Sequence, residues 1–299
     1  MAKVHDVLII GTGITGLAAA RHALQSGLSA AAMESLLFGG LVINVNVLDG
    51  EIEGSGIDLA ATMMTEVKKL GGENIAATAS SIEREGEALV VKSDAGVHRA
   101  RAVIIASGAT LKRLGVPGEA ELEEQGVSHC ADCDGPFYQG QEVVVVGGGD
   151  SALQEAMVLA EFAKQVHLVH RAERFDARPR LAQQIGKLGN IAVHWNTQVA
   201  AVLGEDAVRA VRVRRAEGEA EIACTGFFAY VGLAPAIEFA PAAIERDAHG
   251  FLLTGDNLQT AIPGVFAAGA VRSGYGGLLT HSVAEGIAAA KSAAAMLRA

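Results

Sequence analysis

"DVLIIGTGITGLAAARHALQSGLSAAAME", residues 6–34, decides the fold class of this chain. An apolar run leads into a glycine-rich turn, an alanine-rich segment follows, and a second apolar run ends at Met33 and Glu34. This order predicts a strand, a helix and a second, parallel strand, which together form a βαβ unit. Residues 11–16 read Gly-Thr-Gly-Ile-Thr-Gly and lie between the first strand and the helix, where a glycine turn of this spacing is typical of dinucleotide binding.

Each glycine of this turn has its own physical reason. Gly11 permits the tight turn, Gly13 lets the backbone approach a pyrophosphate, and Gly16 lets the helix pack closely on the strand. The amide groups at the helix N-terminus then face the anion. Glu34, 21 residues after Gly13, falls where a carboxylate binds the hydroxyls of an adenosine ribose. A turn that serves packing alone is the alternative, but strand, helix and acid together favour a nucleotide site.

The same order of elements returns at residues 142–175, "EVVVVGGGDSALQEAMVLAEFAKQVHLVHRAERF", 136 residues after the first turn. Alanine takes the third glycine position, which the pattern tolerates. The second strand ends at a cation instead of an acid, and a cation there suits a ribose 2′-phosphate and favours NADPH over NADH. An ordinary solvated turn remains open for the residues beyond it. The candidate nucleotide-binding residues here are Gly147, Gly149, Asp150, Ser151, Ala152, His170 and Arg171.

Length and composition fit two domains of the α/β class. The chain has 299 residues, of which half are hydrophobic, with 36 glycines and 6 prolines. A net charge of −10 argues against nucleic acid and anionic membranes as partners, because both attract basic surfaces. No apolar run approaches the roughly 18 residues of a membrane span. The start, "MAKVHDVLII", lacks the layout of a signal peptide. We therefore expect a cytoplasmic protein.

Two of the three cysteines lie three positions apart in "SHCADCDG", residues 128–135. A zinc site would need further cysteine or histidine ligands at suitable spacing, and the third cysteine, Cys224, is distant, so no metal site is expected. A structural disulfide across so short a loop adds little stability in a reducing compartment. Two buried spectator thiols are the remaining alternative. A Cys-x-x-Cys pair is well shaped to cycle between dithiol and disulfide, and Asp134 could supply the proton that this cycle needs.

With two nucleotide turns flanking Cys-x-x-Cys-Asp-Gly, the chain resembles the low-molecular-weight, bacterial-type thioredoxin reductases over nearly its whole length. The most specific segments are "GVSHCADCDGPFY", "EVVVVGGGDSALQEA", "VIIASGATLKRLGVPGE" and "IPGVFAAG". The resemblance implies two Rossmann-like domains of three layers (ββα), the second inserted in the first. Residues 1–113 and 242–299 would form a discontinuous FAD domain, and residues 114–241 an NAD(P)H domain that carries the cysteines.

The resemblance also implies a reaction and the residues that serve it. Hydride would pass from NAD(P)H to FAD and on to the Cys130–Cys133 disulfide, in a homodimer whose NADPH domain rotates. Cys133 would face the flavin, Cys130 would attack a thioredoxin-like or other disulfide substrate, and Asp134 would act as the acid. Further cofactor contacts would come from Gly39, Gly40, Gly108, Gly269 and the position of Ala270.

This chain departs from the family pattern at the cofactor positions. The family's Asp, which holds the ribityl chain of the flavin, is replaced by Ala270, and its Arg-Gln beside the flavin ring by Gly276 and Gly277. Ala172 and Asp176 stand where two of three arginines grip the 2′-phosphate, and Leu41 stands where a glutamine is usual. Losing a charge-assisted contact costs about 1.5 to 3 kcal/mol, so we expect a weakened NADPH preference.

The leading hypothesis is therefore a flavin-dependent disulfide oxidoreductase of the thioredoxin reductase type. A second hypothesis keeps flavin and dithiol but makes the protein a dithiol oxidase, or a reductase fed by a donor other than a nicotinamide. A third is a non-catalytic relative that senses redox state. The adjacent cysteine pair beside Asp134 argues against the third hypothesis. Cys224 is expected to be a small buried hydrophobic residue without a role.

Overall fold

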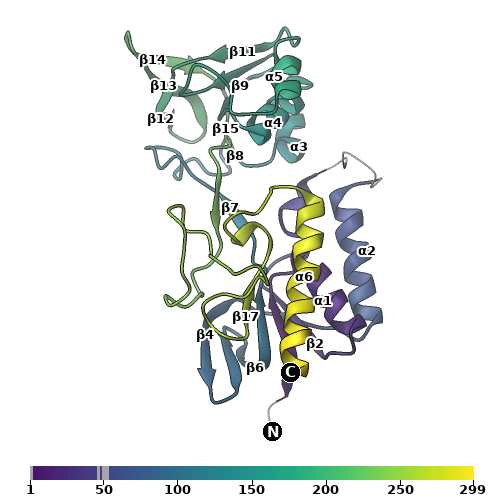
Figure 1. Ribbon diagram of the computed structural model, residues 1–299. Helices are drawn as coiled ribbons and strands as arrows, with labels where there is room; N and C mark the ends of the chain where they lie inside the picture. Colours follow the sequence, from purple (N-terminus) through teal and green to yellow (C-terminus); the bar gives the residue numbers. More distant parts are fainter. Residues whose placement is uncertain (1–2, 46–47, 49–53) are drawn as a thin grey trace. The chain divides into compact units, whose positions relative to one another are not determined.

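Each of the two βαβ segments folds into a pair of adjacent parallel strands, and each pair belongs to a sheet of its own (Figure 1). The computed structural model describes residues 3–45, 48 and 54–299. The chain divides into two compact units: unit 1 comprises residues 1–110 and 234–299, and unit 2 comprises residues 111–233. The predicted α/β class with two Rossmann-like sheets is confirmed.

The sheet of unit 1 has seven strands in the order β3-β2-β1-β6-β5-β4, and β17 also pairs with β6. The pairs around β1 and β6 are parallel, whereas β4, β5 and the first half of β6 form an antiparallel meander. The strands are β1 (Val4–Ile10), β2 (Ala30–Glu34), β3 (Glu73–Ala76), β4 (Ala79–Glu85), β5 (Ala88–Ser93), β6 (Gly96–Ile105) and β17 (Val265–Ala267).

Three helices cover one face of this sheet (Figure 1). They are α1 (Ile14–Gln25), α2 (Gly56–Lys69) and α6 (Leu279–Arg298), and the short 3-10 helices η1 (Gly40–Asn44) and η3 (Gly269–Val271) belong to the same unit. Alternate residues of β1 pack on opposite faces, Val7 and Ile9 toward the helices and Leu8 and Ile10 toward the other side, as the period of a strand requires. Small residues let α1 and α6 approach, because a Cβ on Gly286 would lie 2.2 Å from the carbonyl oxygen of Thr15.

Unit 2 is built around a five-stranded sheet in the order β11-β10-β9-β15-β8, and all of its pairs are parallel. These strands are β8 (Val127–Ser128), β9 (Glu142–Val146), β10 (Gln165–Val169), β11 (Ile191–His194) and β15 (Gly226–Ala229). A separate antiparallel sheet has the order β12-β13-β14, with β12 (Gln198–Gly204), β13 (Val208–Arg215) and β14 (Gly218–Ala223).

The two faces of β9 carry different partners. Val143 and Val145 pack against the helices, and Val144 and Val146 pack against the antiparallel sheet, so unit 2 has three layers. Its helices are α3 (Ala131–Asp134), η2 (Gly135–Tyr138), α4 (Asp150–Ala160) and α5 (Pro179–Ile185). The strands β7 (Ala109–Leu111) and β16 (Leu233–Pro235) pair where the chain passes between the units. Among the described residues, no helix is both long and apolar enough to cross a membrane.

Candidate functional site

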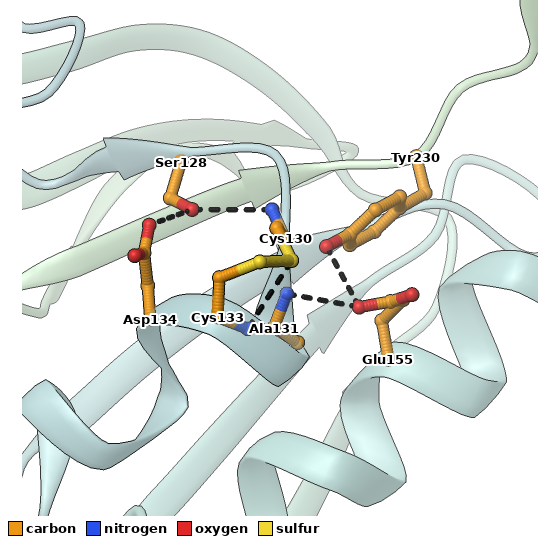
Figure 2. The surroundings of a disulfide bond; sticks show 7 residues. All are labelled: Ser128, Cys130, Ala131, Cys133, Asp134, Glu155 and Tyr230. Carbon is orange, nitrogen blue, oxygen red and sulfur yellow. Dashed lines mark hydrogen bonds between the residues drawn. A yellow bond between two sulfur atoms is a disulfide. The ribbon is translucent and has the colours of Figure 1, made fainter. Parts of the chain in front are cut away.

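The two cysteines of "SHCADCDG" form a disulfide at the start of α3, directly after β8 (Figure 2). Their Cα atoms are 5.3 Å apart. Cys130 is the N-cap of α3, and its Sγ accepts a hydrogen bond from the amide of Cys133 at 3.1 Å. Cys133 is exposed and Cys130 is half-buried. The pair is therefore placed on a single helical turn at the surface of unit 2, where a change of redox state needs little movement of the backbone.

One side of this turn carries a serine and an aspartate. The hydroxyl of Ser128 donates to Oδ2 of Asp134 at 2.5 Å and accepts from the amide of Cys130 at 3.2 Å. Ser128 is buried, and Asp134 is half-buried. The serine thus links the predicted acid to the backbone of the first cysteine.

The opposite side carries a glutamate and a tyrosine (Figure 2). Oε2 of Glu155 accepts from the amide of Ala131 at 3.0 Å and from the hydroxyl of Tyr230 at 3.1 Å. Burial raises the pKa of Glu155, the negative charge of Asp132 adds to that effect, and the two hydrogen bonds oppose it. Burial and the neighbouring Glu155 also raise the pKa of the Tyr230 hydroxyl, so it acts as a donor. The cysteine turn is therefore held from both sides by polar groups of unit 2.

A cavity of about 530 Å³ opens in unit 2 at the second glycine turn. Gly147, Gly148 and Gly149 line it, together with Arg171 and Tyr230. Gly149 is the N-cap of α4 and has no side-chain cap, and a Cβ added there would meet nothing within 4 Å. Free amides and open space at a helix N-terminus fit a pyrophosphate, so these residues could hold a dinucleotide.

The imidazole of His170 packs against two aromatic side chains where β10 ends. Its ring lies against Gly148, where a Cβ would fall 2.1 Å from the imidazole, and its Nε2 bonds to the carbonyl of Arg174 at 2.9 Å. The rings of Phe175 and Trp195 lie 5.7 and 6.0 Å from that of His170. Gly148 must therefore be glycine, because the imidazole of His170 occupies the space in which a side chain would begin.

Two charged residues, Asp176 and Arg178, follow β10 near this cavity. Asp176 lines the cavity, at a position where the resemblance leads us to expect an arginine. Arg178 is engaged elsewhere: its amide donates to Oδ1 of Asp150 at 2.8 Å, and its Nε donates to Oδ2 at 2.6 Å. Of these groups, Arg171 is the cation that lines the cavity. Ser151 is exposed, whereas Ala152 lies on the buried face of α4 and packs in the core of unit 2.

The first glycine turn is equally open at its helix end. Gly11 has φ +102°, and a Cβ on Gly16 would lie 1.9 Å from the carbonyl oxygen of Gly11, so both must be glycine. Oε2 of Glu34 accepts from the Thr12 amide at 3.0 Å, and Oε1 accepts from the amides that follow it. The predicted ribose-binding acid is therefore fixed beside the turn, and Gly13, the N-cap of α1, provides no side-chain cap.

Further predicted cofactor residues converge on the same end of α1. Gly39 forms a bridge with Gly13, and its amide donates to the carbonyl of Thr12 at 2.8 Å. Gly40 begins η1, and Gly108 has φ +73° with open space where a Cβ would be. Gly39 and Gly40 are packed closely, since a Cβ would lie 2.5 Å from the Ile43 side chain at Gly39 and 3.4 Å from Cα of Gly13 at Gly40, so Gly108 is the one of the three that leaves open space for a ligand.

The positions of unit 1 at which the sequence departs from the family pattern make defined contacts. The amide of Gly269 donates to Oε2 of Glu285 at 2.8 Å, and Glu285 also pairs with Arg272. Ala270 follows in η3 and is half-buried. At Gly276 a Cβ would lie 2.0 Å from Nδ1 of His281, so the imidazole fills the space beside that glycine.

Sequence reasoning missed Ser128, Glu155, Tyr230 and the Asp150–Arg178 pair. Glu155 had a signal: it falls at helical spacing within the buried stripe of α4, between Leu153 and Ala156, where a carboxylate needs partners. The others become visible only when segments distant in sequence meet. Cys224 is buried, and burial raises its pKa to about 12.

Comparisons with known proteins agree with this geometry. A family model described as pyridine nucleotide-disulphide oxidoreductase matches residues 5–293. The chain is 34% identical to a thioredoxin reductase of Treponema pallidum, covering 99% of this chain and 98% of that protein. It is 35% identical to a thioredoxin reductase of Bacillus subtilis, covering 97% and 94%. The crystal structure of Lactococcus lactis thioredoxin reductase matches with a TM-score of 0.94 and 32% identity, covering 98% of this chain and 99% of that one.

Proposed function

The chain belongs to the pyridine nucleotide-disulphide oxidoreductase family, and we propose that it reduces a thioredoxin-like protein or a small disulfide with electrons from NAD(P)H. The family predicted from the cysteine and glycine motifs is confirmed. The chain is a flavin-dependent oxidoreductase of the thioredoxin reductase type that acts on sulfur groups. The observation that carries the proposal is the Cys130–Cys133 disulfide, set between an acid and the wall of the cavity at the second glycine turn.

The Cys130–Cys133 pair would pass electrons to the substrate by thiol–disulfide exchange. Opening the disulfide takes up two electrons and two protons and gives two thiols. Cys130 passes its proton to the carboxylate of Asp134, and its thiolate attacks one sulfur of the substrate disulfide and expels the other as a thiolate, which the proton returned by Asp134 converts to a thiol. Cys133 then attacks the sulfur of Cys130, re-forms the internal disulfide and releases the second substrate thiol.

FAD is the cofactor that we place in unit 1, and when bound it supplies the two electrons that open the disulfide. The glycine turn at residues 11–16 and the uncapped start of α1 would bind its pyrophosphate. Glu34 would orient the adenosine ribose, Gly108 would leave open space for the ligand, and Gly39, Gly40 and Gly269 would let the surrounding segments pack closely around it. Ala270 offers no side-chain oxygen, so the ribityl chain would be held by fewer hydrogen bonds.

NADH or NADPH would bind in the cavity of unit 2, with a weak preference for the phosphorylated form. Arg171 lines the ribose end, Asp176 adds a negative charge there, and Arg178 is occupied by Asp150. A 2′-phosphate would meet one arginine beside a carboxylate, which removes much of the usual gain from charge-assisted hydrogen bonds.

The test is spectroscopic. The purified protein should be yellow, and anaerobic addition of NADH or NADPH should bleach the flavin absorbance and then support reduction of thioredoxin. Cys133→Ser should abolish substrate reduction while leaving flavin bleaching in place. A colourless protein that cannot take up FAD would overturn the proposal, as would unchanged disulfide reduction by Cys133→Ser.

The family resemblance also leads us to propose a cytoplasmic homodimer. Light scattering of the purified protein should give twice the mass of the chain, and a monomeric mass at micromolar concentration would contradict this part of the proposal.

A further inference from the structure

Glu155 is a carboxylate on a helix face that is otherwise apolar. The neighbouring positions of α4 that are buried are Ala152, Leu153, Ala156 and Leu159. Glu155 itself is largely shielded from solvent and takes both of its protein hydrogen bonds on Oε2. Burying a carboxylate is costly, so a position of this kind is expected to have a purpose beyond packing.

Its first partner belongs to the redox turn. Ala131 lies between the cysteines, directly after Cys130, and its amide points at Glu155 (Figure 2). The same turn presents the amide of Cys133 to the sulfur of Cys130. Glu155 therefore fixes the peptide next to the sulfur from which the substrate-attacking thiolate would form.

Its second partner belongs to the cavity. Tyr230 follows β15, lines the cavity at the second glycine turn and donates its hydroxyl to Glu155. One carboxylate oxygen thus joins the wall of the nucleotide cavity to the cysteine turn, all within unit 2.

We propose that Glu155 is a positioning residue for the dithiol: its carboxylate holds the cysteine turn against Tyr230 and, by its negative charge, keeps the reduced cysteines protonated. This inference rests on the proposed function, because it assumes that Cys130 and Cys133 cycle. A negative charge near a thiol disfavours the thiolate. A dithiol that stays protonated resists alkylation and oxidation between turnovers.

The other charges near the turn can be separated from this one. Asp132 on α3 and the hydroxyl of Tyr230 face Glu155, while Asp134 lies on the opposite side of the turn, bonded to Ser128 (Figure 2). Glu155→Gln removes the charge of Glu155 and leaves these groups unchanged. It also keeps an acceptor for both hydrogen bonds, so the turn should remain in place.

The experiment measures how fast iodoacetamide alkylates the reduced protein across a range of pH, with peptide mapping to assign each cysteine. In Glu155→Gln the midpoint for Cys130 or Cys133 should fall by about one pH unit, which is about ten times more thiolate at a pH below the midpoint. Glu161→Gln removes a charge from the exposed end of the same helix and should leave the midpoint unchanged. Buried Cys224 serves as an internal reference and should not respond to either substitution.

A second measurement tests the effect of the Glu155 charge on the redox equilibrium of the disulfide. The equilibrium of the disulfide with glutathione at pH 9 should move several-fold toward the dithiol in Glu155→Gln, because the thiolate is then populated. A midpoint within about 0.3 pH units of wild type, in a protein with a native circular dichroism spectrum, would overturn the inference. That result would leave the proposed function intact, since alkylation needs neither flavin nor nucleotide, whereas wild type without disulfide reductase activity would remove the function itself.

Discussion

A chain of hydrogen bonds in unit 2 makes its stability depend on pH through one histidine. Arg215 on β13 donates to Nδ1 of His194 at 2.9 Å, and Nε2 of His194 lies 3.1 Å from Nδ1 of His167. Nε2 of His167 lies 3.3 Å from a carboxylate oxygen of Glu142, which also pairs with Lys164. Because the guanidinium can only donate, His194 is neutral with its proton on Nε2, and each ring then donates to the next group.

Protonating His194 would break this chain at its first bond. Burial, with contributions from His167 and Arg215, lowers the pKa of His194 from 6.5 to about 4. The unfolded chain therefore takes up this proton near pH 6.5, whereas the folded protein takes it up near pH 4. The free energy of unfolding must fall as the pH is lowered through this window and level off below it. The full difference corresponds to about 3.4 kcal/mol at 1.36 kcal/mol per pH unit, and solvent screening at the partly exposed ring reduces it to about 1–2 kcal/mol.

The assay uses the fluorescence of Trp195, the single tryptophan of the chain, which follows His194 directly. Urea unfolding of wild type and His194→Gln is measured at pH 7 and pH 4.5. Wild type should lose about 1–2 kcal/mol more than the variant between the two values. His249→Gln replaces an exposed histidine of unit 1 and should behave as wild type. Equal losses in wild type and His194→Gln, or a wild type that gains stability toward pH 4.5, would refute the reasoning.

Three further predictions follow from the site. Asp176→Arg should raise the affinity for NADP+ relative to NAD+ by about tenfold or more in calorimetric titration, because an arginine replaces a carboxylate at the ribose end, while Glu173→Arg in the same loop should not. Asp134→Asn should lower kcat for disulfide reduction by about a hundredfold, as removal of a general acid does, and an unchanged kcat would exclude Asp134 from that role. Gly148→Ala should destabilise unit 2 by about 1–3 kcal/mol in urea, since its Cβ would lie 2.1 Å from the imidazole of His170. Gly149→Ala, whose Cβ meets nothing within 4 Å, is the control, and equal stability of the two variants would contradict that steric argument.

Local patterns in the sequence were sufficient for the parallel parts of the fold. The apolar runs before each glycine turn became β1 and β9, and the segments after them became α1 and α4. These features depend on contacts between residues that are close in sequence, so periodicity reports them. The motifs do not extend to the antiparallel strands β4, β5 and β12 to β14. Those strands are stabilised by pairing with neighbouring strands, and no glycine turn or helix in the sequence indicates where these strands lie.

The residues of the candidate site were likewise predictable where they are adjacent in sequence and not where distant segments meet. The cysteine pair and the acid after it are adjacent in sequence, so spacing alone pointed to Cys130, Cys133 and Asp134. Tyr230 lies 75 residues from Glu155, and only the parallel pairing of β15 with β9 brings the two together. The pairing of Arg178 with Asp150 likewise spans 28 residues. The sequence already indicated a weakened site for a 2′-phosphate from Ala172 and Asp176, but it did not indicate that Asp150 also binds Arg178.

The two βαβ segments have the same order of elements, but their helices differ at a position that faces the cysteine turn in unit 2. Counting from the N-caps Gly13 and Gly149, Ala19 of α1 corresponds to Glu155 of α4. Ala19 is fully buried, and its backbone amide lies 3.1 Å from where a Cβ of Gly286 would be, so α1 and α6 pack closely at this position. In unit 2 the residue at this position faces the cysteine turn, whose Ala131 amide donates a hydrogen bond to Glu155. A carboxylate at this position is therefore explained by the cysteine turn whose amide it accepts from and not by the nucleotide fold that the two units share.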